Sequence, residues 1–304
     1  MPDREKKTFH GTVTIRGKKV GRPSQRITLH PKDLKVTSAK IIKHDKKGDQ
    51  DIAVTRINLQ RSFDEVRLHT EAMLYGGDYT VTLEFSGNIH DVMHGIYPCN
   101  YEVDGVKKQL IATQFESHHA REAFPCVDEP EAKATFDLTL TIPKGEVALS
   151  NTPVKSQVNE GQTVVTTFET TPKMSTYLLA FVYGEMQYKE AKTKDGVVVR
   201  VWATKAQNTE ALDFPLDVGV KVVEFFNDYY GVPYPLAKCD HVALPDFSSA
   251  AMENWGLITY REAYLLVDPK TTSQSMKEVI TTVIAHELSH QWFGNLVTMK
   301  WWDD

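Results

Sequence analysis

The stretch YTVTLEF, residues 79–85, decides the fold class of the first part of the chain. Its apolar residues alternate with polar ones, so the apolar set lies on one face of a strand. The same alternation recurs in TVTI (residues 12–15) and FDLTLTI (residues 136–142), and turn residues such as Asp104 and Gly105 separate these stretches. Half-buried strands joined by turns predict an antiparallel β-sandwich or a large curved sheet.

The pattern changes after about residue 187. VVVRVW, residues 197–202, predicts one further strand. From Asp213 to Tyr230 the apolar spacing is helical, and Gly231 is placed to end that helix. The residues that we expect on its apolar face are Val218, Val222, Phe225, Phe226 and Tyr229.

A second helix is predicted from Ser275 to Phe293, with Gly294 after its end and Ser273 or Ser275 as its cap. Its expected apolar face contains Met276, Val279, Ile280, Val283 and Ile284. The change from strands to helices predicts two domains. Residues 1–187 form a β domain, and residues 188–304 begin an α/β domain.

The composition is that of a folded globular protein. Hydrophobic residues make up 41% of the 304 residues and charged residues 25%, which excludes a disordered chain. No apolar run approaches the roughly 20 residues of a membrane helix, and the charged start of the sequence does not resemble a secretory signal. Three widely spaced cysteines, Cys99, Cys126 and Cys239, indicate no disulfide framework. Cytoplasm is the expected location.

The charge is distributed unevenly. Residues 1–50 contain 14 basic and 5 acidic residues, whereas the whole chain has a net charge of −5. A basic end is typical of nucleic-acid or membrane contact. No aromatic or glycine-rich recognition motif accompanies these lysines, so we favour the solvated face of strands. We expect neither a nucleic-acid nor a membrane partner.

The motif HELSH, residues 286–290, lies near the end of the second predicted helix. Residues four apart share one helix face, so His286 and His290 can present two imidazoles to one ion. Glu287 is then close enough to reach a water on that ion, as in the His-Glu-x-x-His signature of zinc peptidases. The alternative is a pair of core histidines, which is disfavoured because burying these polar groups on an apolar helix is costly.

Two histidines do not complete a catalytic zinc site, which normally has three protein ligands. Only 14 residues follow His290, and the acids among them are Asp303 and Asp304. Neither is assigned as the third ligand. The other nine histidines have no helical spacing to this pair.

Four stretches together resemble the M1 family of zinc aminopeptidases. They are HELSHQWFGNLVT (residues 286–298), WWDD (residues 301–304), AAMENWG (residues 250–256), and TQFE (residues 113–116) with the downstream AR and FPCVDEP, residues 120–121 and 124–130. Their order and spacing agree across about 190 residues. The resemblance implies an N-terminal β domain followed by a thermolysin-like α/β catalytic domain that, in this chain, ends soon after the HExxH helix.

The resemblance also implies a Zn²⁺ cofactor held by His286 and His290, with Glu287 as the general base. It assigns Glu116 and Glu253 to the free N-terminal amine of a peptide substrate, with Gln114 lining the same pocket. The exopeptidase motif corresponds to Ala250, Ala251, Met252, Glu253 and Asn254. Carboxylates beside the metal suit this role, because the amine is a cation that fixes which peptide bond reaches the zinc.

Two departures from the family pattern affect these expectations. Ala250 stands where the family motif usually begins with glycine, and an added methyl group there can change substrate contacts. The family's third zinc ligand is a glutamate that eighteen residues separate from the second histidine, which places it beyond Asp304. We therefore expect the 304-residue chain alone to be inactive and to bind zinc weakly at best.

Two alternatives to an aminopeptidase stay open. One is a related zinc hydrolase, either an endopeptidase or an epoxide hydrolase, although Glu116 is typical of the peptidase branch of the family. The other is a non-catalytic binding module. The expected partners are peptides with a free N-terminus. The sequence leaves open the preferred N-terminal residue and the oligomeric state.

Overall fold

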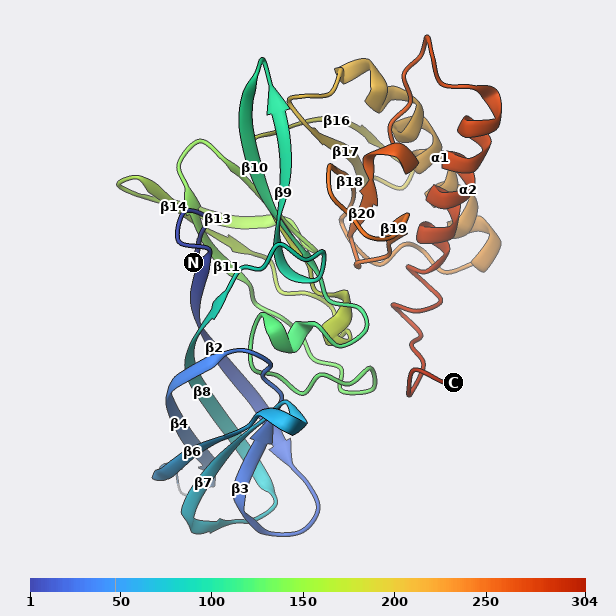
Figure 1. Cartoon of the computed structure of the whole chain (residues 1–304). Coiled ribbons are helices and arrows are strands. Elements are labelled where there is room, and N and C mark those ends of the chain that lie inside the picture. Colours follow the sequence, from blue (N-terminus) through green and yellow to red (C-terminus); the bar gives the residue numbers. More distant parts are fainter. Residues whose placement is uncertain (47) are drawn as a thin grey trace. The chain divides into compact units, whose positions relative to one another are not determined.

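A computed structural model describes residues 1–46 and 48–304. The chain divides into two compact units, which are coloured along the sequence in Figure 1. The first comprises Met1–His90 and His118–Asp128, and the second comprises Asp91–Ser117 and Glu129–Asp304.

The first unit is a β-sandwich. Its larger sheet has the order β1 (Pro2–Asp3), β2 (Thr8–Lys19), β8 (Gly77–Asn88), β4 (Lys35–Asp45) and β5 (Gly48–Ile52). Its smaller sheet has the order β3 (Ser24–Leu29), β7 (Glu65–Leu74) and β6 (Val54–Gln60), and the helical turns η1 (Arg61–Phe63) and η2 (Ala120–Glu122) complete the unit. All strand pairs are antiparallel. The antiparallel sandwich predicted from the sequence is confirmed.

The alternation in β8 places its apolar residues as expected. Tyr79, Val81, Leu83 and Phe85 are all buried. The first three belong to the sandwich core, with Leu29, Ile41, Ile52, Val66, Leu68 and Leu74. A strand whose side chains alternate between faces thus buries one of its two residue sets.

The second unit begins with two antiparallel sheets. One has the order β12 (Val147–Ser150), β15 (Phe181–Gly184), β10 (Val106–Gln114) and β9 (Gly95–Val103), and the other the order β11 (Thr139–Pro143), β14 (Thr163–Phe168) and β13 (Val154–Glu160). Asp104 and Gly105 form the predicted turn between β9 and β10, both with positive φ, as a type I′ hairpin requires. The strand expected over residues 136–142 begins only at Thr139.

A mixed sheet follows in the same unit. Its order is β16 (Met186–Lys192), β17 (Val198–Thr204), β18 (Lys238–Leu244), β20 (Leu257–Arg261) and β19 (Ala251–Met252). The three central strands are parallel, and both edge strands are antiparallel. Short helical turns lie at η3 (Thr176–Leu178), η4 (Thr209–Leu212) and η5 (Glu262–Tyr264). The domain boundary predicted between residues 187 and 188 lies within β16 and stays a prediction.

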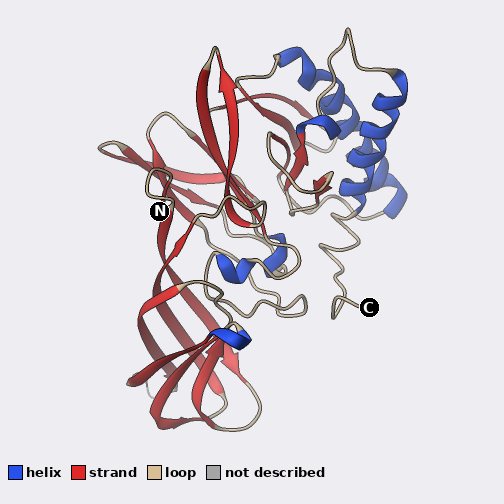
Figure 2. Cartoon of the chain, in the orientation of Figure 1, coloured by secondary structure: helices blue, strands red, loops and turns tan. Residues whose placement is uncertain are grey.

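Two α-helices, which pack against each other in the second unit, are the long blue helices of Figure 2. The first, α1 (Asp213–Tyr230), has the predicted bounds and ends at Gly231 with positive φ. Its buried face, however, consists of Pro215, Val218, Gly219, Val223 and Asn227, whereas Phe225 and Tyr229 are exposed. The apolar pattern places aromatic residues on two sides of this helix, so the packed side could not be read from spacing alone.

The second helix, α2 (Gln274–Ser289), begins one residue before the predicted Ser275. The Ser273 hydroxyl caps it by accepting a hydrogen bond from Met276 N. The helix ends at Ser289, before the predicted Phe293, and its buried residues are Ile280, Ile284, Glu287 and Leu288. Val279, expected on the apolar face, is exposed. In the described part of the chain, no helix is both long and apolar enough to span a bilayer. All three cysteines are free and buried.

Candidate active site

The end of α2 brings the two histidines of the HELSH motif together. The Nε2 atoms of His286 and His290 lie 3.1 Å apart, and their rings are nearly perpendicular. His290 Nδ1 lies 2.9 Å from the carbonyl oxygen of Phe293. A ring that donates through Nδ1 keeps its lone pair on Nε2, the tautomer that binds a metal.

This geometry fits a tetrahedral zinc ion. Two nitrogen ligands at about 2.0–2.1 Å from such an ion are separated by roughly 3.3 Å. The observed separation of 3.1 Å is close to that value. In the described residues, however, no third His, Cys, Asp or Glu joins His286 and His290 in a group whose ligand atoms all lie within 4.8 Å of one another.

Glu287 lies between the two histidines in sequence, and its side chain is buried. Its Oε2 atom has no hydrogen-bond partner in the described structure. Burial, and to a smaller extent the negative charges of Glu253 and Glu116, raise the pKa of this carboxyl to about 8. A buried carboxyl with a raised pKa and a free oxygen is typical of a site that takes up and releases a proton.

Glu253 follows β19, in the turn that leads to β20. The side chain of Glu253 lies close to Gly294, a residue with φ +128°. A Cβ atom on Gly294 would be 3.2 Å from His290 Nδ1 and 3.9 Å from Glu253 Oε1. The carboxylate of Glu253 and the ring of His290 therefore both lie close to Gly294.

Gln114 and Glu116 lie at the end of β10. The Oγ1 atom of the preceding Thr113 exchanges hydrogen bonds with both Phe181 N and Phe181 O, which fixes this strand end. Gln114 is buried and its Oε1 atom has no partner among the described residues. Partial burial and the charge of Glu253 raise the pKa of Glu116, while His290 lowers it. The structure thus brings Glu116 and Glu253 near His290.

The segment that resembles an exopeptidase motif, residues 250–254, lies at the edge of the mixed sheet. Ala251 and Met252 form β19 and pair with Tyr260 and Thr259. Asn254 is buried and donates from Nδ2 to Thr259 Oγ1.

Ala250, the departure from the family pattern, accepts a hydrogen bond from Arg261 N. It has no positive φ, so its methyl group does not strain the backbone.

Two tyrosines near the site were not predicted from the sequence. Tyr177 in η3 donates from its hydroxyl to Gly294 O at 3.1 Å, and burial, Glu253 and Glu116 raise its pKa. Tyr260 in β20 is fully buried, lies 2.9 Å from His241 Nδ1, and has a pKa raised by burial and by Glu287. Both occur within apolar stretches, so no motif distinguishes them from core residues.

Comparison with known proteins identifies a family for the chain. The profile of the Peptidase M1 N-terminal domain matches residues 1–178, and that of the Peptidase family M1 domain matches residues 214–304. Aminopeptidase N of Lactococcus lactis subsp. lactis is 52% identical over 99% of this chain, and Aminopeptidase N of Lactobacillus helveticus is 46% identical over 99%. Aminopeptidase M1 of Arabidopsis thaliana is 42% identical over 99%.

The chain covers 34% of the length of each of these three proteins, so it spans about a third of the curated relatives it matches. The N-terminal profile alone covers more than half of the chain. The chain therefore belongs to the M1 peptidase family.

Proposed function

We propose that this chain carries part of the active site of a zinc-dependent aminopeptidase, which removes N-terminal residues from peptides. The observation that carries the proposal is the pair of Nε2 atoms on His286 and His290, 3.1 Å apart, on the helix that also holds Glu287 with an unpartnered Oε2 in the described structure. Family membership supports it, since the matched relatives are named aminopeptidases.

His286 and His290 would hold the zinc ion. When bound, zinc acts as a Lewis acid that polarises the scissile carbonyl and lowers the pKa of water. Glu287 takes a proton from the attacking water at Oε2 and gives it to the leaving amine. Its raised pKa, about 8, suits this exchange near neutral pH, because a base works best when its pKa is close to the working pH.

Glu116 and Glu253 would bind the free amine of the substrate, and Gln114 would line the same pocket. The negative charges of Glu116 and Glu253 raise the pKa of the buried Glu287, because ionised carboxylates in this site repel one another. A cationic amine relieves that repulsion, so the free N-terminus binds and only the first peptide bond reaches the metal.

Replacing Glu287 tests the mechanism. In the full-length product of the gene that encodes this chain, Glu287→Gln is expected to lower kcat on aminoacyl-arylamides by about 10²–10⁴-fold, with zinc content unchanged by metal analysis. Glu278→Gln, an exposed position on the same helix, is the matched control. Unchanged turnover in Glu287→Gln contradicts the mechanism.

The substrate class needs a separate comparison. An aminopeptidase cleaves peptides with a free N-terminus and leaves their N-acetylated forms intact. Equal cleavage of both forms indicates an endopeptidase. Turnover of an epoxide without peptide cleavage indicates an epoxide hydrolase. Binding of peptides without any turnover indicates a non-catalytic module.

The 304-residue chain on its own is expected to be inactive and to bind zinc weakly, since its described residues bring only two ligands together. Titration of the purified chain with zinc, using His290→Ala as control, measures that affinity. Chelator-sensitive turnover by the chain alone contradicts this expectation. A cytoplasmic location stays a prediction from the sequence.

A further inference from the structure

The helix α2 ends at Ser289, one turn before its apolar pattern does, and Gln291 lies just beyond the C-cap residue His290. The backbone N–H of Gln291 bonds to Leu288 O, so it no longer bonds to Glu287 O as a continuing helix requires. The side chain replaces that bond, because Gln291 Nε2 donates to Glu287 O at 3.2 Å. The backbone carbonyl oxygen of Glu287 thus accepts a hydrogen bond from a side-chain amide rather than from a backbone N–H of the helix.

The same amide also holds the turn that carries Glu253. Gln291 Nε2 donates to Glu253 O at 3.1 Å, and Gln291 Oε1 accepts from Gly256 N at 3.2 Å. The side chain is fully buried. Both amide hydrogens and the carbonyl oxygen are therefore engaged, and they join the end of α2 to the two ends of the turn.

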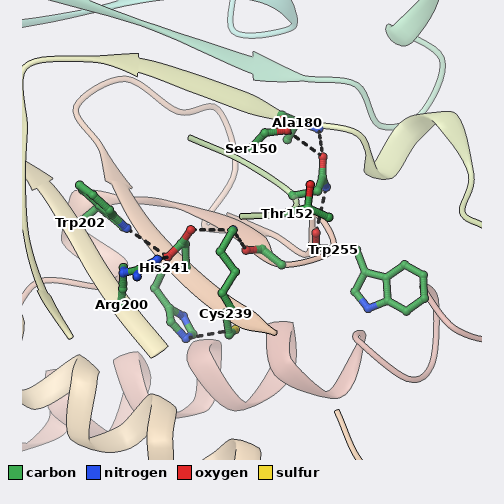
Figure 3. Close-up of polar contacts among 12 residues, drawn as sticks. Ser150, Thr152, Ala180, Arg200, Trp202, Cys239, His241 and Trp255 are labelled. Atoms are coloured by element: carbon green, nitrogen blue, oxygen red, sulfur yellow. Dashed lines mark hydrogen bonds and ion pairs between the residues drawn. The ribbon is translucent and has the colours of Figure 1, made fainter. Parts of the chain in front are cut away.

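Other buried side chains hold the remaining backbone of this turn. Asn295 Nδ2 donates to Glu253 O, Lys238 Nζ donates to Gly256 O, and Asn151 Nδ2 donates to Trp255 O. Figure 3 shows the part of this network that runs past Trp255 and on to Arg200 and Trp202. Of these anchors, Gln291 and Asn295 come from the segment that follows α2.

The carboxylate of Glu253 has a different environment from its backbone. Its side chain is half-buried, and in the described residues no hydrogen bond to its carboxylate oxygens is found, although its oxygen lies near Gly294. A carboxylate kept free for a ligand has to be placed by its backbone rather than by a side-chain partner.

We propose that Gln291 is a positioning residue for recognition of the substrate amine. It sets the carboxylate of Glu253 relative to His286 and Glu287 by joining the turn to the end of α2. The proposal rests on the proposed aminopeptidase function. It predicts that loss of the Gln291 amide weakens the preference for a free N-terminus more than it weakens bond cleavage itself.

The test uses Gln291→Met in the full-length gene product. The measurement is the ratio of kcat/KM for a free peptide to that for its N-acetylated form. We expect this ratio to fall at least tenfold, through a higher KM for the free peptide, with zinc content unchanged. Amide hydrogen exchange in a peptide covering residues 253–257 is expected to become faster.

Gln187→Met is the matched control, since it removes another amide of the second unit, half-buried in β16, that donates to Thr204 O and Gln207 O and not to the turn. It is expected to lower stability without changing the ratio. Asn295→Ala removes the second donor to Glu253 O and is expected to lower the ratio about threefold. It also serves if Gln291→Met does not fold.

The outcomes separate the two proposals. A parent enzyme that cleaves free and acetylated peptides equally contradicts the proposed function. If folded Gln291→Met keeps the parent enzyme's preference for a free N-terminus, the positioning role alone is contradicted. Where Gln291→Met does not fold, an unchanged preference in Asn295→Ala contradicts it in the same way. An equal fall of the ratio in Gln187→Met also overturns it, since general destabilisation then accounts for the effect.

Discussion

The sandwich of the first unit and the mixed sheet of the second are both built from strands, but different forces hold them. The sandwich core consists mainly of apolar side chains, including Leu68 and Leu83, and contains no buried charged side chain among its members. In the mixed sheet, every residue of the central strand β18 is buried, and these residues include Lys238, Asp240 and His241. The sandwich is stabilised by buried apolar surface. The mixed sheet depends on buried polar groups, which also hold the turn that contains Glu253.

The largest effect is expected from breaking the buried ion pair of β18. Lys238 Nζ lies 2.6 Å from Asp240 Oδ2 and also donates to Gly256 O. Lys238→Met leaves the buried Asp240 with the more distant cation of Arg200, whose Nη1 lies 3.8 Å from Oδ1. This loss of the closer partner is expected to lower the free energy of unfolding by about 3 kcal/mol. Urea unfolding measures this loss.

The double variant Lys238→Met with Asp240→Leu is the control, because it removes both charges. It is expected to regain part of the stability. If Lys238→Met alone is as stable as the parent chain, the polar description of this sheet is wrong.

A loss that is no larger is expected from the sandwich core. Leu83 is fully buried among apolar side chains. Leu83→Ala is expected to lower the free energy of unfolding by about 3 kcal/mol, through lost burial and the cavity left behind. In the full-length gene product, kcat/KM of the folded variant is expected to stay at the parent value. A change in the preference for free N-termini would show that the two regions are not independent.

The same contrast decides what could be predicted from the sequence. In β8, alternation identified the buried face, because a strand with one solvated side must separate its apolar and polar residues. In β18, KCDHVAL, the charged residues resemble a surface loop, and the strand was not predicted. Both faces of a central parallel strand are covered, so alternation disappears, and the polar residues survive there only because they are paired.

The candidate site divides in a similar way. The four-residue spacing was enough to place His286 and His290 on one helix face, and family resemblance brought in Glu116 and Glu253. Spacing could not reveal Tyr177, whose hydroxyl reaches Gly294 from a distant part of the chain. It also could not reveal that α2 ends at Ser289, because that end depends on hydrogen bonds to the Glu253 turn.

The pH dependence of stability tests the polar region next. The pKa of Glu287 is about 8 in the fold, above its ordinary value of 4.5. Its contribution to stability is therefore full below pH 4.5 and is lost as the pH rises toward 8. Between pH 5 and 7 the loss is at most about 2.7 kcal/mol for one group.

Urea unfolding of the metal-free chain at these two pH values measures the loss, and Glu287→Gln is expected to remove it. The sandwich variant Leu83→Ala is expected to keep the same pH dependence as the parent chain. An equal pH dependence in the parent chain and in Glu287→Gln would show that the buried carboxyl is not its source.

The smallest effect is expected on the outer face of α1, where sequence and structure disagree. Phe225 is 58% exposed and stacks on Tyr229, which is 71% exposed, whereas Val223 is completely buried. Phe225→Gln is expected to change the free energy of unfolding by no more than about 0.5 kcal/mol. Val223→Ala, on the buried side of the same helix, is expected to cost about 2 kcal/mol, although it removes fewer carbon atoms. Urea unfolding of both variants compares the two faces. A larger loss in Phe225→Gln would mean that the apolar spacing, rather than the packing seen in the structure, identifies the side of α1 that is buried.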